Sequence, residues 1–422
     1  MGTVMAIYKL GDSLIDTRAP DTRAALAAAH GAKARPLCVC RSPGVEMYVA
    51  KSSGGYVVKR MPNTGGDHEA DCDSFEPPPE LSGLGAVLGS AIEESPNDDV
   101  TTLKLGFSLS RAGTRMTPTA GAADKPSATT AGSRLTQRGL LHFLWEEARL
   151  NRWWPAMEGR RGWGVVRREL LGAAENKEAK GGALAKSLYI PEPFVVEKAD
   201  ELQGRRDTLL ASVKRPPKGP RPLMLVIAEV KAMSPARYGY KIAFKHLPDF
   251  PFMLDEELHK AVRKRFASEL ELNSAVEDSH LIAIGTFGLA VSGLAGLEEI
   301  SLQVMTANWL PFETMHEKQL LDAMTAQGRR FIKGLRYNMS ALAPLASIVA
   351  LDTVPLATAM YVVPPGSSQE YCASLDALIA QSRFASWRWD VESAAMPALP
   401  AATRRSLPPP VRALPDLRSE AR

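Results

Sequence analysis

The sequence lacks the features that mark membrane proteins, secreted proteins and several large enzyme classes. It contains no run of about 18 apolar residues, which a transmembrane helix would need. Residues 1–10 hold neither a long apolar segment nor a small-residue cleavage site, so we expect no secretory signal. A phosphate-binding loop, a GxGxxG fingerprint and a GxSxG nucleophile turn are also missing. The commonest nucleotide-binding and hydrolase classes are therefore not indicated.

Cysteine and excess charge are both scarce. Four cysteines in 422 residues are too few for a disulfide framework, so we expect a reduced, cytoplasmic protein without a membrane partner. In that compartment, cysteines that lie close together in the sequence indicate metal or redox chemistry. The 51 basic and 47 acidic residues give a formal net charge of only +4. A net charge this small does not predict a nucleic-acid partner, although it can conceal a local basic face.

Shifts in composition and in hydrophobic spacing divide the chain into six regions. We predict an α/β (α+β) protein in which a zinc-bound β-hairpin module precedes a small helical domain and a C-terminal α/β domain with a mixed sheet. The helical domain is compatible with a winged-helix arrangement and equally with other small helical folds. The regions are an N-terminal arm (1–35), the zinc-binding β module (36–111), a flexible linker (112–134), the helical domain (135–195), the α/β domain (196–390) and a disordered tail (391–422).

Four potential zinc ligands lie in two short groups of the second region. Cys38 and Cys40 form one pair, and His68 and Cys72 form the other. The β-forming stretches between the pairs predict a hairpin, which would return the chain to its starting point. Thiolates and imidazoles are the ligands of structural zinc, and four protein ligands leave no open position for catalysis. We therefore predict a structural zinc ion held by these four side chains.

Two other interpretations of the cysteines remain open. One treats Cys38 and Cys40 as small buried apolar side chains with His68 at the surface. The other treats the two cysteines as a redox pair. Cys372 lies far along the chain, and we expect it to be an ordinary core residue.

An enzymatic alternative rests on Glu229 and Lys231, which follow a continuous apolar run. A Glu-x-Lys sequence at the end of a strand is one half of the PD-(D/E)xK nuclease site, in which carboxylates hold Mg²⁺ and the lysine assists the attacking water. Asp207 is the candidate for the upstream aspartate, although it lacks the usual Pro-Asp context. Because Glu-x-Lys is common by chance, the preferred interpretation is a pair of solvent-facing charges at a strand edge.

A second nuclease-like pattern near the C-terminus is looser. The spacing predicts a long helix over 314–334 and two short strands over 347–351 and 359–363. Pro344-Leu345-Ala346 stands where such nucleases carry Pro-Asp, and Met360-Tyr361-Val362 stands where they carry a Glu-containing strand. With both acidic positions missing, this region is predicted to be unable to hold a catalytic metal ion.

Basic residues gather in the predicted helical regions. If these residues lie on one face of the protein, they would bind phosphates, and the arginines next to Trp163 would stack on exposed bases together with it. The competing interpretation is a set of solvated helix faces balanced by nearby acids. Lys260 to Arg265 form a further cluster on a helix predicted over 255–272. The candidate nucleic-acid contacts are Arg160, Arg161, Arg167, Arg168, Arg329, Arg330, Lys333 and Arg336.

Several short motifs together resemble a bacterial family, the domain of unknown function 1173. They include Cys38-Val39-Cys40, Lys59-Arg60-Met61-Pro62, Leu81-Ser82-Gly83-Leu84-Gly85, Trp309-Leu310-Pro311 and Lys333-Gly334-Leu335-Arg336-Tyr337-Asn338. The three N-terminal cysteines of the family match Cys38, Cys40 and Cys72. The resemblance implies a protein of plasmids and integrative elements, and it supplies no activity or catalytic residues.

The leading hypothesis is a non-enzymatic, zinc-stabilised protein of a mobile element that associates with DNA or serves as a scaffold for other proteins of the element. The alternative is a Mg²⁺-dependent nuclease that uses Glu229 and Lys231, with Asp207.

Overall fold

The computed structural model describes residues 7–402, except residues 18, 20, 21, 53, 97, 98, 112–131 and 214–218. This part of the chain contains eight α-helices and several mixed sheets, which confirms the predicted mixed α/β class. A nuclease-like fold is not confirmed. Most of the predicted linker and the end of the predicted tail lie outside the described residues. None of the described helices combines the length and the apolar content needed to cross a membrane.

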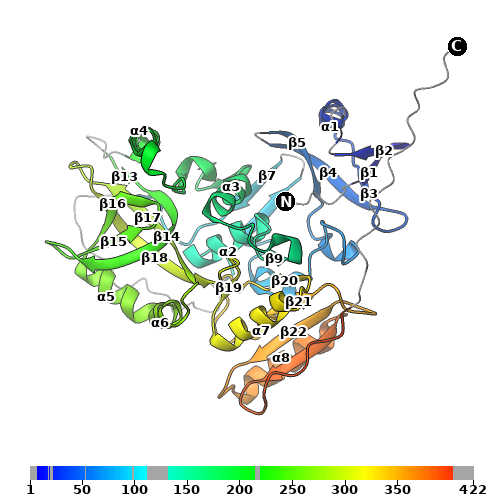
Figure 1. Cartoon of the computed structure of the whole chain (residues 1–422). Helices are drawn as coiled ribbons and strands as arrows, with labels where there is room; N and C mark the ends of the chain where they lie inside the picture. The colour runs from blue at the N-terminus through cyan, green and yellow to red at the C-terminus, as the bar shows by residue number, and fades with distance from the viewer. Residues whose placement is uncertain are drawn as a thin grey trace.

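The N-terminal sheet carries the predicted hairpin and extends beyond it. The hairpin is formed by β4 (Val45–Ser52) and β5 (Gly55–Arg60), in a sheet of order β2-β1-β3-β4-β5. The other strands are β1 (Ile7–Leu10), β2 (Ser13–Asp16) and β3 (Leu37–Cys38). Helix α1 (Thr22–Gly31) covers the hairpin and buries Leu26 and Ala29 against it (Figure 1). Strands β1, β2 and β3 therefore belong to the sheet and α1 packs on it, so the described part of residues 7–35 does not form a separate arm.

Five strands in the middle of the chain close into a barrel. They pair in the order β14-β15-β16-β18-β17, and β17 pairs again with β14. All of these pairings are antiparallel except that between β16 and β18. The strands are β14 (Met224–Pro235), β15 (Tyr240–Phe244), β16 (Leu247–Leu254), β17 (His280–Leu289) and β18 (Ala295–Met305). Helices α5 (Glu256–Arg265) and α6 (Ala267–Ala275) connect the third and fourth strands. This strand order and helix position are those of the oligonucleotide/oligosaccharide-binding (OB) fold.

The residues of β14 explain why the barrel is joined to the preceding helices. Its alternate side chains Val226 and Ala228 face the barrel interior, whereas Leu225 and Ile227 face outward. The outward pair shares a core with α2 (Gln137–Glu147) and α3 (Trp163–Ala173), so this strand is buried on both sides. In Figure 1, α2 lies between the barrel and the N-terminal sheet. The predicted helical domain thus has no core of its own.

Several short elements connect the regions predicted to be separate. A four-stranded sheet joins β6 (Ile92–Ser95) and β7 (Val100–Leu103) to β10 (Lys177–Ala179) and β11 (Gly182–Ala183). Further pairings add β12 to β14, β19 to β18, and β8 to β13. These elements are β8 (Ser110–Arg111), β12 (Leu188–Tyr189), β13 (Arg221–Pro222) and β19 (Pro311–Phe312), together with the exposed helix α4 (Ala199–Leu210).

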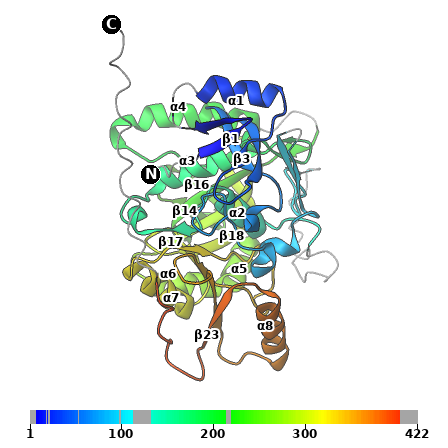
Figure 2. The same ribbon diagram turned by 90° about the vertical axis from the view of Figure 1, so that its right-hand side faces the viewer.

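The C-terminal sheet has the order β23-β22-β21-β20-β9. Its strands are β9 (Arg152–Trp153), β20 (Phe331–Lys333), β21 (Ile348–Ala350), β22 (Thr358–Val363) and β23 (Ala385–Asp390). Helix α8 (Gln369–Gln381) connects the parallel strands β22 and β23. Figure 2 shows α8 at the opposite end of the molecule from α1.

Two predictions for this C-terminal region are wrong. The helix predicted over 314–334 is α7 (Met315–Ala326), because Gly328 adopts φ +62° just after its end and Phe331 begins a strand. The tail was predicted to be disordered from residue 391. Instead, Met396 and Leu399 pack on the main core, and the Arg329 Nη1 group donates a hydrogen bond to the Pro400 carbonyl.

Candidate metal centre

The four predicted ligands converge at one point of the N-terminal sheet. Cys38 ends β3 and Cys40 follows it, while His68 and Cys72 come from the segment after β5. The β4–β5 hairpin returns the chain as expected. A Cβ atom on Gly65 would lie 2.6 Å from the Glu76 Cβ, so only glycine fits in the turn that precedes His68.

The distances among the ligand atoms suit a tetrahedral metal ion. All four atoms lie within 4.8 Å of one another. The Cys38 and Cys72 sulfurs are 3.6 Å apart, and His68 Nδ1 lies 3.4 Å from the Cys40 sulfur and 3.6 Å from that of Cys72. A tetrahedron with Zn–S bonds of about 2.3 Å and a Zn–N bond of about 2.0 Å has edges of about 3.5–3.8 Å. The residues therefore fit a structural zinc ion.

The surroundings of the cluster make it a closed site. His68 is only 1% exposed, and its Nε2 atom is buried without a hydrogen-bond partner among the described residues, which leaves Nδ1 to face the thiols. The Ser74 N–H group donates a hydrogen bond to the Cys72 sulfur. Four protein donors fill a tetrahedral ion, so the site offers no open position for a substrate or a catalytic water.

Electrostatics favour a cation between the sulfurs. The hydrogen bond from Cys38, helped by His68 and by the Ser74 N–H, lowers the pKa of Cys72 to about 3. The same hydrogen bond and burial raise the pKa of Cys38, and burial raises the pKa of Cys40. Without a counter-charge, neighbouring thiols cannot all ionise, so a divalent cation supplies what the group lacks.

The nuclease candidates differ in burial and in their contacts. Glu229 is buried, Lys231 is exposed beside a β-bulge, and Asp207 is exposed on α4. Among the described residues, the Cys/His cluster is the only group of three or more metal-ligand side chains. Glu229 instead accepts a hydrogen bond from His280 Nδ1 at 2.6 Å and pairs with the Lys245 ammonium at 2.5 Å.

Most of the basic candidates in the C-terminal cluster serve inside the fold. Arg329 is 3% exposed and binds both carboxylate oxygens of Asp352. Lys333 is 4% exposed and pairs with Glu317 at 2.9 Å. Arg336 is partly buried and pairs with the partly buried Glu313. Of this cluster, Arg330 is partly exposed.

The candidates around Trp163 are divided between interior and surface. Arg161 donates hydrogen bonds to the carbonyls of Leu150 and Asn308, and Arg167 donates to that of Ile190. Arg160 and Arg168 are exposed, and Arg168 pairs with its neighbour Glu169. The eight candidates therefore do not form one continuous exposed basic face.

Sequence reasoning missed two features that the structure brings out. One is the exposed turn between β14 and β15, which carries Arg237 and Tyr238. The other is a cavity beside the metal cluster, lined by Glu146 and Tyr337 among others. Closure of the barrel would have drawn attention to the first. The second is assembled from segments that are more than 200 residues apart in the sequence, such as those that contain Arg60 and Arg383.

The fold and the site define a protein in which a Cys₃His group suited to a metal ion is joined to an OB-type barrel. The family model described as a protein of unknown function, DUF1173, matches residues 8–392. The chain therefore belongs to this family. No curated protein and no solved structure matches the chain.

Proposed function

We propose that the chain is a non-enzymatic protein of a bacterial mobile element, stabilised by zinc, that binds single-stranded DNA on its β14–β18 barrel. The observation that carries the proposal is the OB-type strand order with an arginine and a tyrosine exposed in the turn between the first two strands. In OB folds, this turn, the turn between the fourth and fifth strands, and the face of the second and third strands contact oligonucleotides.

The β14–β15 turn has the side chains that such binding requires. Tyr238 is 77% exposed, which is unusual for a large aromatic ring, and the Arg237 guanidinium lies 5.3 Å from the centre of its ring. Lys231 and Lys241 are exposed on the two flanking strands. An exposed aromatic ring stacks on bases, and the basic groups around it attract phosphates.

Helix α5 continues this surface. The His259 ring on α5 stacks on Tyr240 at the start of β15, with 3.4 Å between the ring centres. The last turn of α5 carries Arg263, Lys264 and Arg265. The acids Glu256 and Glu257 lie in the first turn, so the two ends of the helix differ in charge. A strand that lies across the β14–β15 turn can reach the basic end.

The zinc part of the proposal is supported by the fit of the four ligand atoms to a tetrahedron. A structural ion would hold β3 to the segment 61–76, which otherwise lacks regular strand pairing.

The test of DNA binding is fluorescence anisotropy with a labelled 20-nucleotide oligo(dT) probe (~20 nucleotides exceeds one OB site). The triple variant Arg237→Ala/Tyr238→Ala/Lys241→Ala should weaken binding by at least about tenfold, since one base stack is worth about 1–3 kcal/mol. The slope of log affinity against log salt concentration should become less steep by about 1.4. The variant loses two basic groups, and each lost phosphate contact reduces the slope by about 0.7.

The matched control is Lys180→Ala/Lys186→Ala, which also removes two exposed positive charges but lies away from the barrel turn. This variant should bind within about twofold of the wild type, as expected for solvated surface charges. If the oligonucleotide does not bind at low salt, or if the triple variant and the control behave alike, the barrel is not the DNA-binding element.

A further inference from the structure

A cavity of about 540 Å³ opens between parts of the chain that are mostly distant in sequence. Its walls come from the segment after β5, from β6, from the end of α2, from Tyr337 and from the end of α8. Phe143, Leu84 and Leu88 give it an apolar side. The volume lies in the range of small-molecule sites, which are mostly apolar with a few placed polar groups.

The charged groups that line the cavity do not cancel. Arg60 pairs with Glu76, and Lys177 pairs with Glu147 at 2.5 Å from just behind the wall. Once these pairs are set aside, the lining carboxylates are Asp67, Glu80, Glu94 and Glu146, and the remaining basic group is Arg383. None of these four carboxylates forms an ion pair within the described part of the chain. Acidic groups therefore outnumber basic groups in the lining of the cavity.

Glu146 is a partly buried carboxyl group that lines the cavity. Its Oε2 atom accepts a hydrogen bond from the Tyr337 hydroxyl. Among the described residues, its Oε1 atom has no hydrogen-bond partner, and the residue lines the cavity. A buried carboxyl group with an open oxygen is a ready acceptor for an N–H donor.

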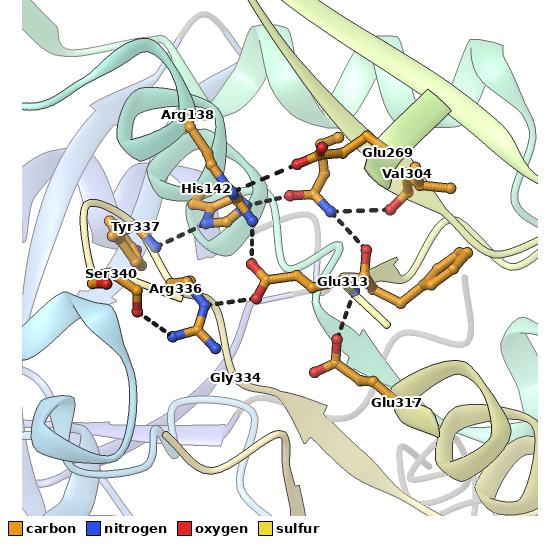
Figure 3. A network of polar contacts seen from close by, with 12 residues as sticks. Arg138, His142, Glu269, Val304, Glu313, Glu317, Gly334, Arg336, Tyr337 and Ser340 are labelled. Carbon is orange, nitrogen blue, oxygen red and sulfur yellow. Dashed lines mark hydrogen bonds and ion pairs between the residues drawn. The ribbon is translucent and has the colours of Figure 1, made fainter. Parts of the chain in front are cut away.

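Tyr337 is held rigidly in this position by a polar network (Figure 3). Its N–H group donates to His142 Nδ1 at 2.9 Å, and His142 Nε2 lies 3.1 Å from Gln303 Oε1. Its neighbour Arg336 joins Arg138 on the carboxylate of Glu313. Tyr337 itself has φ +50°, a costly conformation for a tyrosine. The network thus fixes the hydroxyl that orients Glu146.

The cavity carboxylates are not arranged for a metal ion. No three of them bring donor atoms as close together as the Cys/His cluster does. A bare divalent ion would need several oxygens at about 2.0–2.6 Å from one point. A larger cation, with its charge at one end and an apolar body, matches both the spread of the acids and the apolar wall.

We propose that this cavity is a binding site for a small organic cation, an alkylammonium or arylalkylammonium group whose head contacts Glu146 while its apolar part lies against Phe143 and Leu84. The site is separate from the metal cluster and from the barrel surface, and it adds a small-molecule ligand to a protein proposed above to bind DNA.

Because Glu146 ionises near neutral pH, the affinity for the cation should depend on pH. Burial, the nearby Glu76 and Glu147 raise the pKa of Glu146 to about 7. Tyr337 and Arg152 lower it, but by less. Because the carboxylate form accepts the ammonium group, the ionised fraction and the affinity should rise about tenfold from pH 6 to pH 8. An alkylammonium group keeps its own proton over that range, since amines of this kind titrate near about 10.4.

The experiment is isothermal titration of the full chain, zinc-loaded, at pH 8 with putrescine, agmatine and 2-phenylethylammonium chloride, and with neutral 2-phenylethanol. At least one ammonium compound should bind saturably, with Kd below about 1 mM, and 2-phenylethanol should not. Glu146→Gln, which keeps the hydrogen bond with Tyr337, should weaken binding by at least about tenfold.

The matched control is Glu370→Gln, an exposed acid at the start of α8 outside the cavity, which should bind as the wild type does. If Glu146→Gln does not fold, as judged by thermal melting, Glu94→Gln serves instead and should also weaken binding. The proposal is overturned if no ammonium compound saturates, if the alcohol binds equally well, or if the Glu variants bind like the wild type.

Discussion

At the scale of single residues, the four zinc ligands, which are three sulfurs and one imidazole, can be tested one at a time. Cys72→Ser should abolish stoichiometric zinc binding, because serine supplies no thiolate and leaves the ion three ligands. The melting temperature should fall by several degrees. Metal content is measured by elemental analysis of the purified variant, and Cys372→Ser, which changes a thiol outside the cluster, is the control that should retain the metal.

The contacts of Glu229 predict how the free energy of unfolding changes in acid. Burial works against its charge, but the hydrogen bonds from His280 and Lys245 prevail and lower its pKa. A carboxyl group whose folded pKa lies below the unfolded value of about 4.3 stabilises the fold at neutral pH, and this contribution is lost as the pH falls through the folded pKa. Glu229→Gln should therefore cost about 1–3 kcal/mol at pH 7.

The measurement is urea unfolding of the wild type and of Glu229→Gln at pH 7 and below pH ~4. The gap between the two proteins should narrow in acid, where the wild-type carboxyl group also becomes neutral. A gap of equal size at both pH values would mean that the charge of Glu229 contributes nothing to stability.

At the scale of elements, two distant segments approach closely at Gly83. Its N–H group donates to the Leu335 carbonyl at 2.8 Å, and a Cβ atom there would lie 1.9 Å from the Arg336 carbonyl oxygen. Gly83→Ala must push apart two backbones, so it should destabilise the protein by several kcal/mol (more than about 2). Gly172→Ala in α3, where the added methyl group meets nothing within 4 Å, should be neutral or slightly stabilising. Chemical denaturation of both variants makes the comparison, and equal stabilities would contradict it.

Elements could be predicted from the sequence where local spacing decided them. The β4–β5 hairpin lies between the two ligand pairs as predicted, α2 and α3 lie within the region predicted to be helical, and β14 contains the apolar run before Glu229. The strand β16 was missed because Pro248 and Pro251 interrupt its pattern. The end of α7 was missed because a single glycine with positive φ, Gly328, outweighs the helical pattern that continues beyond it.

At the scale of the whole molecule, the metal cluster could be predicted and the barrel could not. The ligands lie within one short segment joined by a hairpin, so local sequence determines how they meet. Closure of the barrel depends on the pairing of Glu229 with Ile282, and no local pattern records that pairing. Arg329 and Lys333 looked like surface charges because their partners, Asp352 and Glu317, lie in other parts of the chain, which the local sequence pattern does not reveal.

The segment that follows β5 serves two sites at once. It carries His68 and Cys72 to the metal cluster, and it continues to Glu76, which pairs with Arg60 at the cavity and approaches Arg152 of β9. If the zinc ion and the amine proposed above both bind, they would contact the same short span of backbone. Whatever factor the metal ion contributes to the affinity for an amine, the amine must return to the affinity for the metal ion, because the coupling free energy is the same in both directions.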